Sequence, residues 1–157
     1  MMLLIEFASF IVWALAVALF DWRHRLIPNA LIIAGALCAL AFAVAHVSPF
    51  GISIGASLAG LAIGFVALMP FYALGMMGAA DVKTFAALGA WCGPRALVAI
   101  WVAASLAAGL HALVLLARRR AAFASPAEPR RDTTPYAALL ALAALGHMAL
   151  DAPGVRS

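Results

Sequence analysis

Residues 52–74 read ISIGASLAGLAIGFVALMPFYAL and contain no charged side chain. A helix crosses the hydrocarbon core of a bilayer with about 20 apolar residues, so this stretch is long enough to span a membrane. Gly60 and Gly64 form a GxxxG pattern within it. Small residues four positions apart let a neighbouring helix approach closely. The stretch therefore predicts a membrane-spanning helix that packs tightly against a second helix.

The composition of the whole chain agrees with this interpretation. Of its 157 residues, 68% are hydrophobic and only 10% are charged, whereas a typical soluble domain is about half apolar and about a quarter charged. So few polar side chains cannot cover the surface of a soluble globule. This excludes a soluble enzyme and a disordered chain. The composition predicts an all-α protein, a polytopic membrane helix bundle, with a single domain over residues 1–157.

Five further apolar runs predict about six transmembrane helices in all. They cover residues 1–20, 30–47, 84–91, 96–117 and 135–150. The first run lacks a basic start and a cleavage site of small residues, so we expect a retained helix rather than a signal peptide. The run 84–91 is short, because a helix from Asp81 to Trp91 spans only about 16 Å, roughly half of the hydrocarbon core. This helix is either a half-span or begins inside the bundle, and both place Asp81 near or below the membrane surface.

The basic residues predict the orientation in the membrane. If the segment 21–25 faces the cytoplasm, so do the segments 75–83 and 118–134, and these hold eight of the ten Lys and Arg residues. The eight are Arg23, Arg25, Lys83, Arg118, Arg119, Arg120, Arg130 and Arg131. Only Arg95 and Arg156 then lie outside. Because cytoplasmic loops are enriched in Lys and Arg, we expect both termini outside, and the net charge indicates topology rather than binding to nucleic acid.

Two of the six acidic residues, Asp21 and Asp81, lie where an apolar helix meets a polar segment at the same membrane face. Ionisable groups at such depth are costly and mark functional sites. Two carboxyl groups held close together do not both ionise readily, so one keeps its proton. The ionised group can then take a proton from water while the protonated group polarises a peptide carbonyl, as in aspartic proteases. A structural alternative stays open, in which Asp21 pairs with Arg23 or Arg25 and Asp81 caps the helix that follows it.

The cysteines point to no other chemistry. Cys38 and Cys92 lie inside apolar runs and form no CxxC pair, so the sequence gives no support for a metal site or a disulfide framework. The chemistry of paired carboxyl groups needs no cofactor. We therefore expect neither a metal nor a cofactor.

Two short motifs resemble those of the type IV prepilin peptidases. DWRHRLIPN at 21–29 resembles their signature D-x-R-x-x-x-I-P-N, and GAADVK at 78–83 resembles G-x-G-D-x-K, with Ala80 in place of the second glycine. The spacing of sixty residues between Asp21 and Asp81 is similar to that of the family, and so is the pair Pro135-Tyr136 at the start of the last run. The resemblance covers essentially the whole chain.

This resemblance implies a GxGD-type aspartyl endopeptidase of the bacterial inner membrane. Its substrate would be a prepilin or pseudopilin, whose basic leader is removed at the cytoplasmic face by Asp21 and Asp81. Larger members of the family also N-methylate the new N-terminus, using an extra segment with cysteine pairs. The small size and the cysteine content here indicate a peptidase without methyltransferase activity, similar to the Flp or tight-adherence type. Membrane lipids and the pilus assembly machinery are the other implied partners.

Eight residues near these motifs are candidates for binding the substrate or shaping the site. They are Arg23, Arg25, Pro28, Asn29, Gly75, Gly78, Lys83 and Tyr136. The three cations can keep one carboxylate ionised or bind lipid phosphates. The proline and asparagine can shape the start of the second helix. The two glycines let the chain bend and approach a peptide closely.

Two other functions stay open at this point. The first keeps the enzyme class but changes the substrate, for example to an archaellin-like precursor. The second is a membrane subunit of a pilus or secretion assembly, or of a transporter, without enzymatic activity. In that protein Asp21 and Asp81 would be a structural pair or a proton relay.

Overall fold

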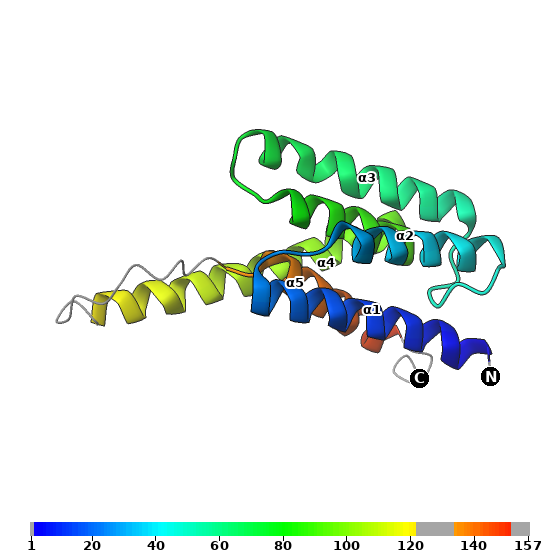
Figure 1. Cartoon of the computed structure of the whole chain (residues 1–157), viewed down its shortest axis with the longest axis horizontal. Coiled ribbons are helices and arrows are strands. Elements are labelled where there is room, and N and C mark those ends of the chain that lie inside the picture. Colours follow the sequence, from blue (N-terminus) through cyan, green and yellow to red (C-terminus); the bar gives the residue numbers. More distant parts are fainter. Residues whose placement is uncertain (1, 122–133, 152–157) are drawn as a thin grey trace.

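The computed structural model describes residues 2–121 and 134–151, and the regular structure in these residues is entirely helical. Five helices follow in order: α1 (Met2–His24), α2 (Asn29–Val44), α3 (Ile54–Ala73), α4 (Ala79–Ala121) and α5 (Tyr136–Asp151). Figure 1 shows them lying side by side, with the end of α4 extending beyond the other helices. The prediction of an all-α bundle is confirmed.

The two predicted runs 84–91 and 96–117 are both helical and lie within α4, one on each side of a break in that helix. The backbone of α4 is non-helical only at Gly93, with φ 75° and ψ 171°. A positive φ disfavours any residue with a Cβ, and Pro94 next to it is well placed in the first turn of the segment that follows. Gly93 therefore breaks α4 into a first segment (79–92) and a second segment (94–121).

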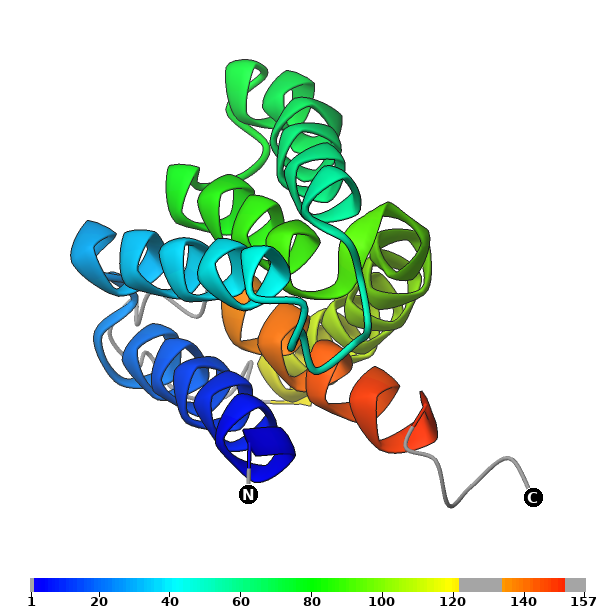
Figure 2. The ribbon, with the colours of Figure 1, turned by 90° about the vertical axis from the view of Figure 1, so that its right-hand side faces the viewer.

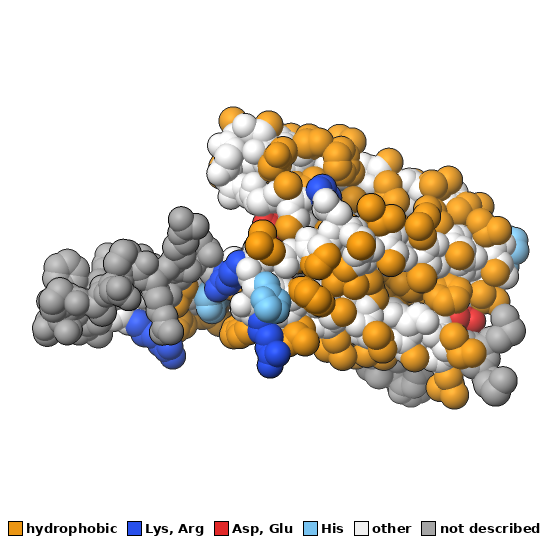
Figure 3. All heavy atoms as spheres, in the orientation of Figure 1, with side chains coloured by type: hydrophobic (Ala, Val, Ile, Leu, Met, Phe, Trp, Pro, Cys, Tyr) orange, Lys and Arg blue, Asp and Glu red, His pale blue; other side chains and the backbone are white. Residues whose placement is uncertain are grey.

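Three helices are long and apolar enough to cross a membrane: Leu4–His24, Ile54–Ala73 and Ala79–Arg118. The helices α2 and α5 are apolar but have only 16 residues each. Large apolar side chains cover much of the surface (Figure 3), and Leu26 and Leu74 are among the most exposed. The protein is therefore a membrane protein, and the number of six crossings stays a prediction.

The first segment of α4 lies in the centre of the bundle, with α3 on one side and α2 and α5 on the other (Figure 2). Phe85, Leu88 and Trp91 are almost completely buried in it. The helix begins at Ala79, five residues before the predicted start at Thr84. The residues at this helix start, Ala79 to Asp81, are half-buried, and the choice between the two alternatives raised by the short run stays a prediction.

The GxxxG pattern of α3 forms a close contact with α4, as predicted. A Cβ atom added at Gly60 would collide with the backbone carbonyl of Gly89 in α4, and one at Gly64 would lie 2.8 Å from the carbonyl oxygen of Phe85. The buried hydroxyl of Ser57 donates a hydrogen bond of 2.6 Å to the carbonyl of Ala90. These contacts hold α3 against the first segment of α4.

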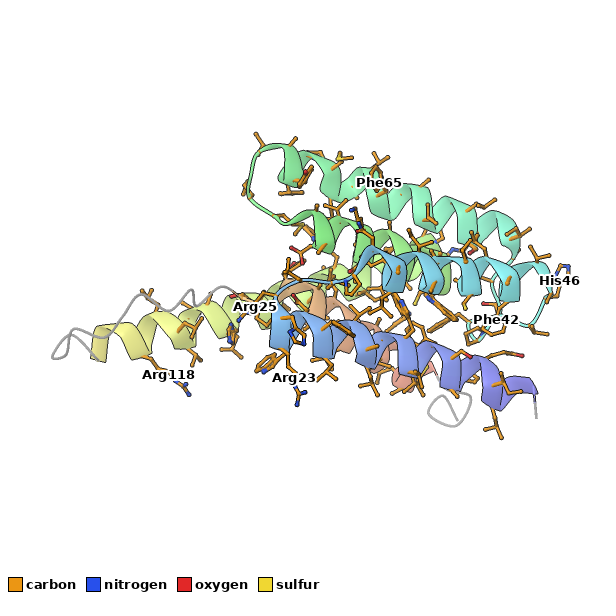
Figure 4. The ribbon with its side chains drawn as sticks, viewed as in Figure 1. Arg23, Arg25, Phe42, His46, Phe65 and Arg118 are labelled. Atoms are coloured by element: carbon orange, nitrogen blue, oxygen red, sulfur yellow. The ribbon has the colours of Figure 1, made fainter. Side chains whose placement is uncertain are left out.

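Three of the described arginines lie toward one end of the bundle. Figure 4 shows Arg23, Arg25 and Arg118 at that end and His46 at the opposite end. The side chains of Arg119, Arg120, Arg130, Arg131 and Arg156 lie outside the described part of the chain. The predicted loop 118–134 begins later than expected, because α4 continues to Ala121, and residues 122–133 are not described.

Candidate active site

A pocket of about 830 Å³ opens near the C-terminal ends of α1 and α3 and the starts of α4 and α5. Asp21 and Asp81 both line it. Its volume lies in the range of sites that bind ligands. The sequence predicted that these two side chains meet, and the structure places them in one cavity.

Asp21 lies in the last turn of α1, not in a loop as predicted, because the helix continues to His24. Its side chain is buried, with an exposed fraction of 7%. The backbone N–H of Ala138 donates a hydrogen bond of 2.8 Å to Oδ2 of Asp21. Ala138 lies in the first turn of α5, where the N–H groups have no partner within the helix and favour a negative charge. The start of α5 therefore holds this carboxyl group in place.

Asp81 is the third residue of α4, and its side chain is half-buried. The backbone N–H of Gly78, which precedes the helix, donates a hydrogen bond of 3.1 Å to Oδ2 of Asp81. A Cβ atom at Gly78 would lie only 3.2 Å from that oxygen, so a glycine keeps the space open. The alternative that Asp81 caps its own helix is correct in part. It does so from the third helical position by reaching back, as the acidic residue of a capping box does.

The first turn of α5 joins the two carboxyl groups. The backbone N–H of Ala137 interacts with both Asp21 and Asp81, and the two side chains interact electrostatically with each other. Two acids from α1 and α4 are thus brought together by a third helix that is far from both in sequence. Two carboxyl groups that interact in this way do not both ionise readily, so the pair can hold a single proton.

Arg25 and Gly75 are two further predicted residues that line the pocket. Arg25 ends α1 with a positive φ of 54°, an uncommon conformation outside glycine, and its charge acts on Asp21. Gly75 has a φ of 71° in the connection between α3 and α4. Arg23 is exposed and is not among the lining residues (Figure 4).

Three predicted residues lie away from the pocket. Lys83 donates a hydrogen bond of 3.0 Å from Nζ to Oδ1 of Asn29, which ties the start of α4 to the start of α2. Both side chains line a separate cavity of about 310 Å³. Pro28 caps α2 instead of occupying its first turn as predicted, and its carbonyl accepts a hydrogen bond from the N–H of Leu31. These residues position helices and do not contact the two acids.

Tyr136 lines the pocket, and its hydroxyl lies 3.0 Å from that of Ser105 in the second segment of α4. Sequence reasoning missed Ser105, Trp101 and Thr134, which also line the cavity. The four-residue spacing of Trp101 and Ser105 places them on one helical face. This spacing was the one indication in the sequence that the two side chains could line the same cavity. Nothing in the sequence showed which neighbour this face meets.

A double-mutant cycle tests the contact between Tyr136 and Ser105. We expect Tyr136→Phe and Ser105→Ala each to lower the free energy of unfolding by about 1 kcal/mol, because each removes one partner of a hydrogen bond. The double variant should be little less stable than either single variant. Thermal unfolding in detergent measures all four proteins. Strictly additive losses would contradict the contact.

A third carboxyl group, that of Glu6, is also buried, and its Oε2 has no hydrogen-bond partner. Glu6 and Asp21 are fifteen residues apart on α1, which is about 22 Å along a helix. Glu6 therefore lies well outside the pocket. Among the described residues, no group of three His, Cys, Asp or Glu side chains is arranged to hold a metal ion.

The match to known proteins covers the helices that carry both acids. The model of the type IV leader peptidase family matches residues 8–113. The chain belongs to this family. As a type IV leader peptidase it is a hydrolase, and the resemblance seen in the two motifs is confirmed. No curated protein and no solved structure matches the chain. The first turn of α5, which holds the two acids of this leader peptidase, lies beyond the matched residues.

Proposed function

We propose that this leader peptidase is an aspartyl endopeptidase in which Asp21 and Asp81 cleave the leader from a type IV prepilin of the Flp type. The observation that carries the proposal is the shared pocket, in which both carboxyl groups face one cavity and are held by backbone N–H groups. These backbone donors hold each carboxyl group in a defined orientation before the substrate binds. The peptidase domain would extend over residues 1–157.

The reaction needs one proton shared by the two carboxyl groups. The ionised carboxylate takes a proton from a water molecule as its oxygen attacks the carbonyl carbon of the scissile bond. The protonated carboxyl group donates a hydrogen bond and then its proton to the carbonyl oxygen. As the tetrahedral intermediate collapses, the carboxyl group that took the water proton gives it to the leaving nitrogen, and the carbon–nitrogen bond breaks. A hydroxyl group of the intermediate returns its proton to the other carboxylate, which restores the single shared proton. The products are the carboxyl group of the leader and the amine of the mature chain.

The charge distribution supports an active site at the cytoplasmic face of the bacterial inner membrane. Arg23, Arg25 and Arg118 lie toward the end of the bundle where the pocket opens (Figure 4). Positive residues are retained on the cytoplasmic side, so both termini would lie outside. Anionic lipids would be bound by the same arginines.

We propose peptidase activity without N-methyl transfer. The cysteines Cys38 and Cys92 lie in separate helices, one exposed and one buried, and only residues 25–28 connect α1 to α2. We expect a co-expressed prepilin to be shortened by its leader and to carry an unmodified N-terminus. Mass spectrometry of the mature product measures both changes. A product with an added methyl group that depends on this chain would contradict the proposal.

The second candidate is a subunit of a pilus or secretion assembly without enzymatic activity. It is favoured by the hydrogen bonds that Asp21 and Asp81 make to helix ends, since these also stabilise the fold. Purified protein that leaves every candidate precursor intact but remains bound to an assembly protein would support it. The predicted docking of segment 118–134 to the pilus assembly machinery falls largely on residues outside those described.

A further inference from the structure

An apolar groove of about 180 Å³ runs between α3 and the second segment of α4. Its floor is buried and formed by Leu68, Phe85 and Leu97, each exposed by no more than 3%. Its rims are exposed, with Ile63 and Ala67 on α3 facing Val98 and Trp101 on α4. No charged side chain lines it. A groove of this kind, on a membrane protein, is open to the bilayer.

The break at Gly93 provides the opening. The glycine contacts hold α3 against the first segment of α4, because Gly60 meets Gly89 and Gly64 meets Phe85. Beyond Gly93 the second segment takes a different direction (Figure 2), and Pro94 lies at the end of the groove. From Pro94 to Trp101 the helix rises by about 10 Å, which matches about two turns of a helix packed beside it.

The groove adjoins the pocket of the two acids. Leu68, Phe71 and Trp101 line both cavities. We propose that the groove binds an apolar helical segment of the substrate, which enters from the bilayer between α3 and α4 so that its end reaches Asp21 and Asp81. This inference rests on the proposed peptidase function and adds the entry path and the residues that select the substrate.

The chemistry of the two cavities supports one occupant that passes through both. The groove offers only apolar contacts, whereas the pocket offers two carboxyl groups, Arg25 and backbone N–H groups. A polypeptide with an apolar segment directly beside its cleaved bond fits both parts. An isolated acyl chain would fill the groove, but it carries no polar group that would bind in the adjoining pocket of the two acids.

Filling the groove tests the proposal. We expect Ala67→Trp to slow cleavage of a full-length precursor in phospholipid vesicles at least tenfold. Ala62→Trp places the same side chain on an exposed position of α3 that does not line the groove, and it should cleave at the wild-type rate. Equal cleavage by the two variants would overturn the proposal. If the wild-type protein also fails to cleave the precursor, that result would instead contradict the proposed function.

Disulfide crosslinking gives a second measurement in case Ala67→Trp does not accumulate. Cys38 and Cys92 are first replaced by Ala, and Asp21→Asn keeps the precursor intact. Val98→Cys should crosslink to single cysteines in the first two turns of the apolar segment that follows the cleavage site, and Ala62→Cys should not. Crosslinks at Ala62→Cys alone, or at neither position, would overturn the proposal. In the latter case the groove is left to lipid.

Discussion

Asp21→Asn and Asp81→Asn are each expected to reduce cleavage of a co-expressed prepilin by at least about a thousandfold. General acid and base catalysis contributes about 10² to 10⁴ in rate, and the mechanism uses both carboxyl groups in one step, so the loss of either should fall in the upper part of this range. Asparagine keeps the size of the side chain and an oxygen that accepts the N–H of Ala138 or Gly78. The fold should therefore persist, and conversion of precursor to mature product on immunoblots measures activity.

Glu6→Gln provides the matched control for these two variants. It also replaces a buried carboxyl group of α1 by an amide, but at the other end of the helix. We expect it to cleave at a rate within a few-fold of the wild type. Normal cleavage by Asp21→Asn or Asp81→Asn would rule out the proposed pair. Equal losses in all three variants would indicate a general effect of buried charge on the fold.

Gly89→Ala should lower the free energy of unfolding by about 2 kcal/mol or more, although it adds only one methyl group. The new Cβ would collide with the backbone carbonyl of Gly60. A backbone atom cannot move aside as a flexible side chain can, so the cost should lie at the upper end of the 1–3 kcal/mol typical of overpacked sites. Thermal unfolding in detergent and the amount of protein in the membrane both measure the effect.

Gly109→Ala tests whether the effect comes from the contact rather than from α4 itself. A Cβ at Gly109 meets nothing within 4 Å. Because alanine favours a helix over glycine by about 0.5–1 kcal/mol, this variant should be slightly more stable than the wild type. The two substitutions are chemically identical and lie in the two segments of α4, yet their effects on stability should have opposite signs. If both raise stability, the close packing of α3 on α4 is wrong.

The arrangement around the acids shows where prediction from the sequence ended. The apolar runs, the GxxxG contact and the two aspartates were all visible, because membrane burial and close helix packing depend on local composition and spacing. The role of α5 was not visible, because Ala137 and Ala138 act through backbone N–H groups that any residue except proline has. Ser105 is similar, since a lone serine in an apolar run gives no sign of its partner, Tyr136.

Lys83 and Asn29 show the opposite case, in which motif position was a poor guide to location. Each stands in the same motif as an aspartate, Lys83 two residues after Asp81 and Asn29 eight residues after Asp21, yet they meet each other at a separate cavity. Neighbours along a helix diverge by 100° per residue, so closeness in sequence does not imply a shared pocket. The sequence alone determined a helical membrane protein and predicted two acids at one membrane face. The tertiary structure decided which helix end holds those acids and where a groove opens beside them, because both depend on the direction that α4 takes after Gly93.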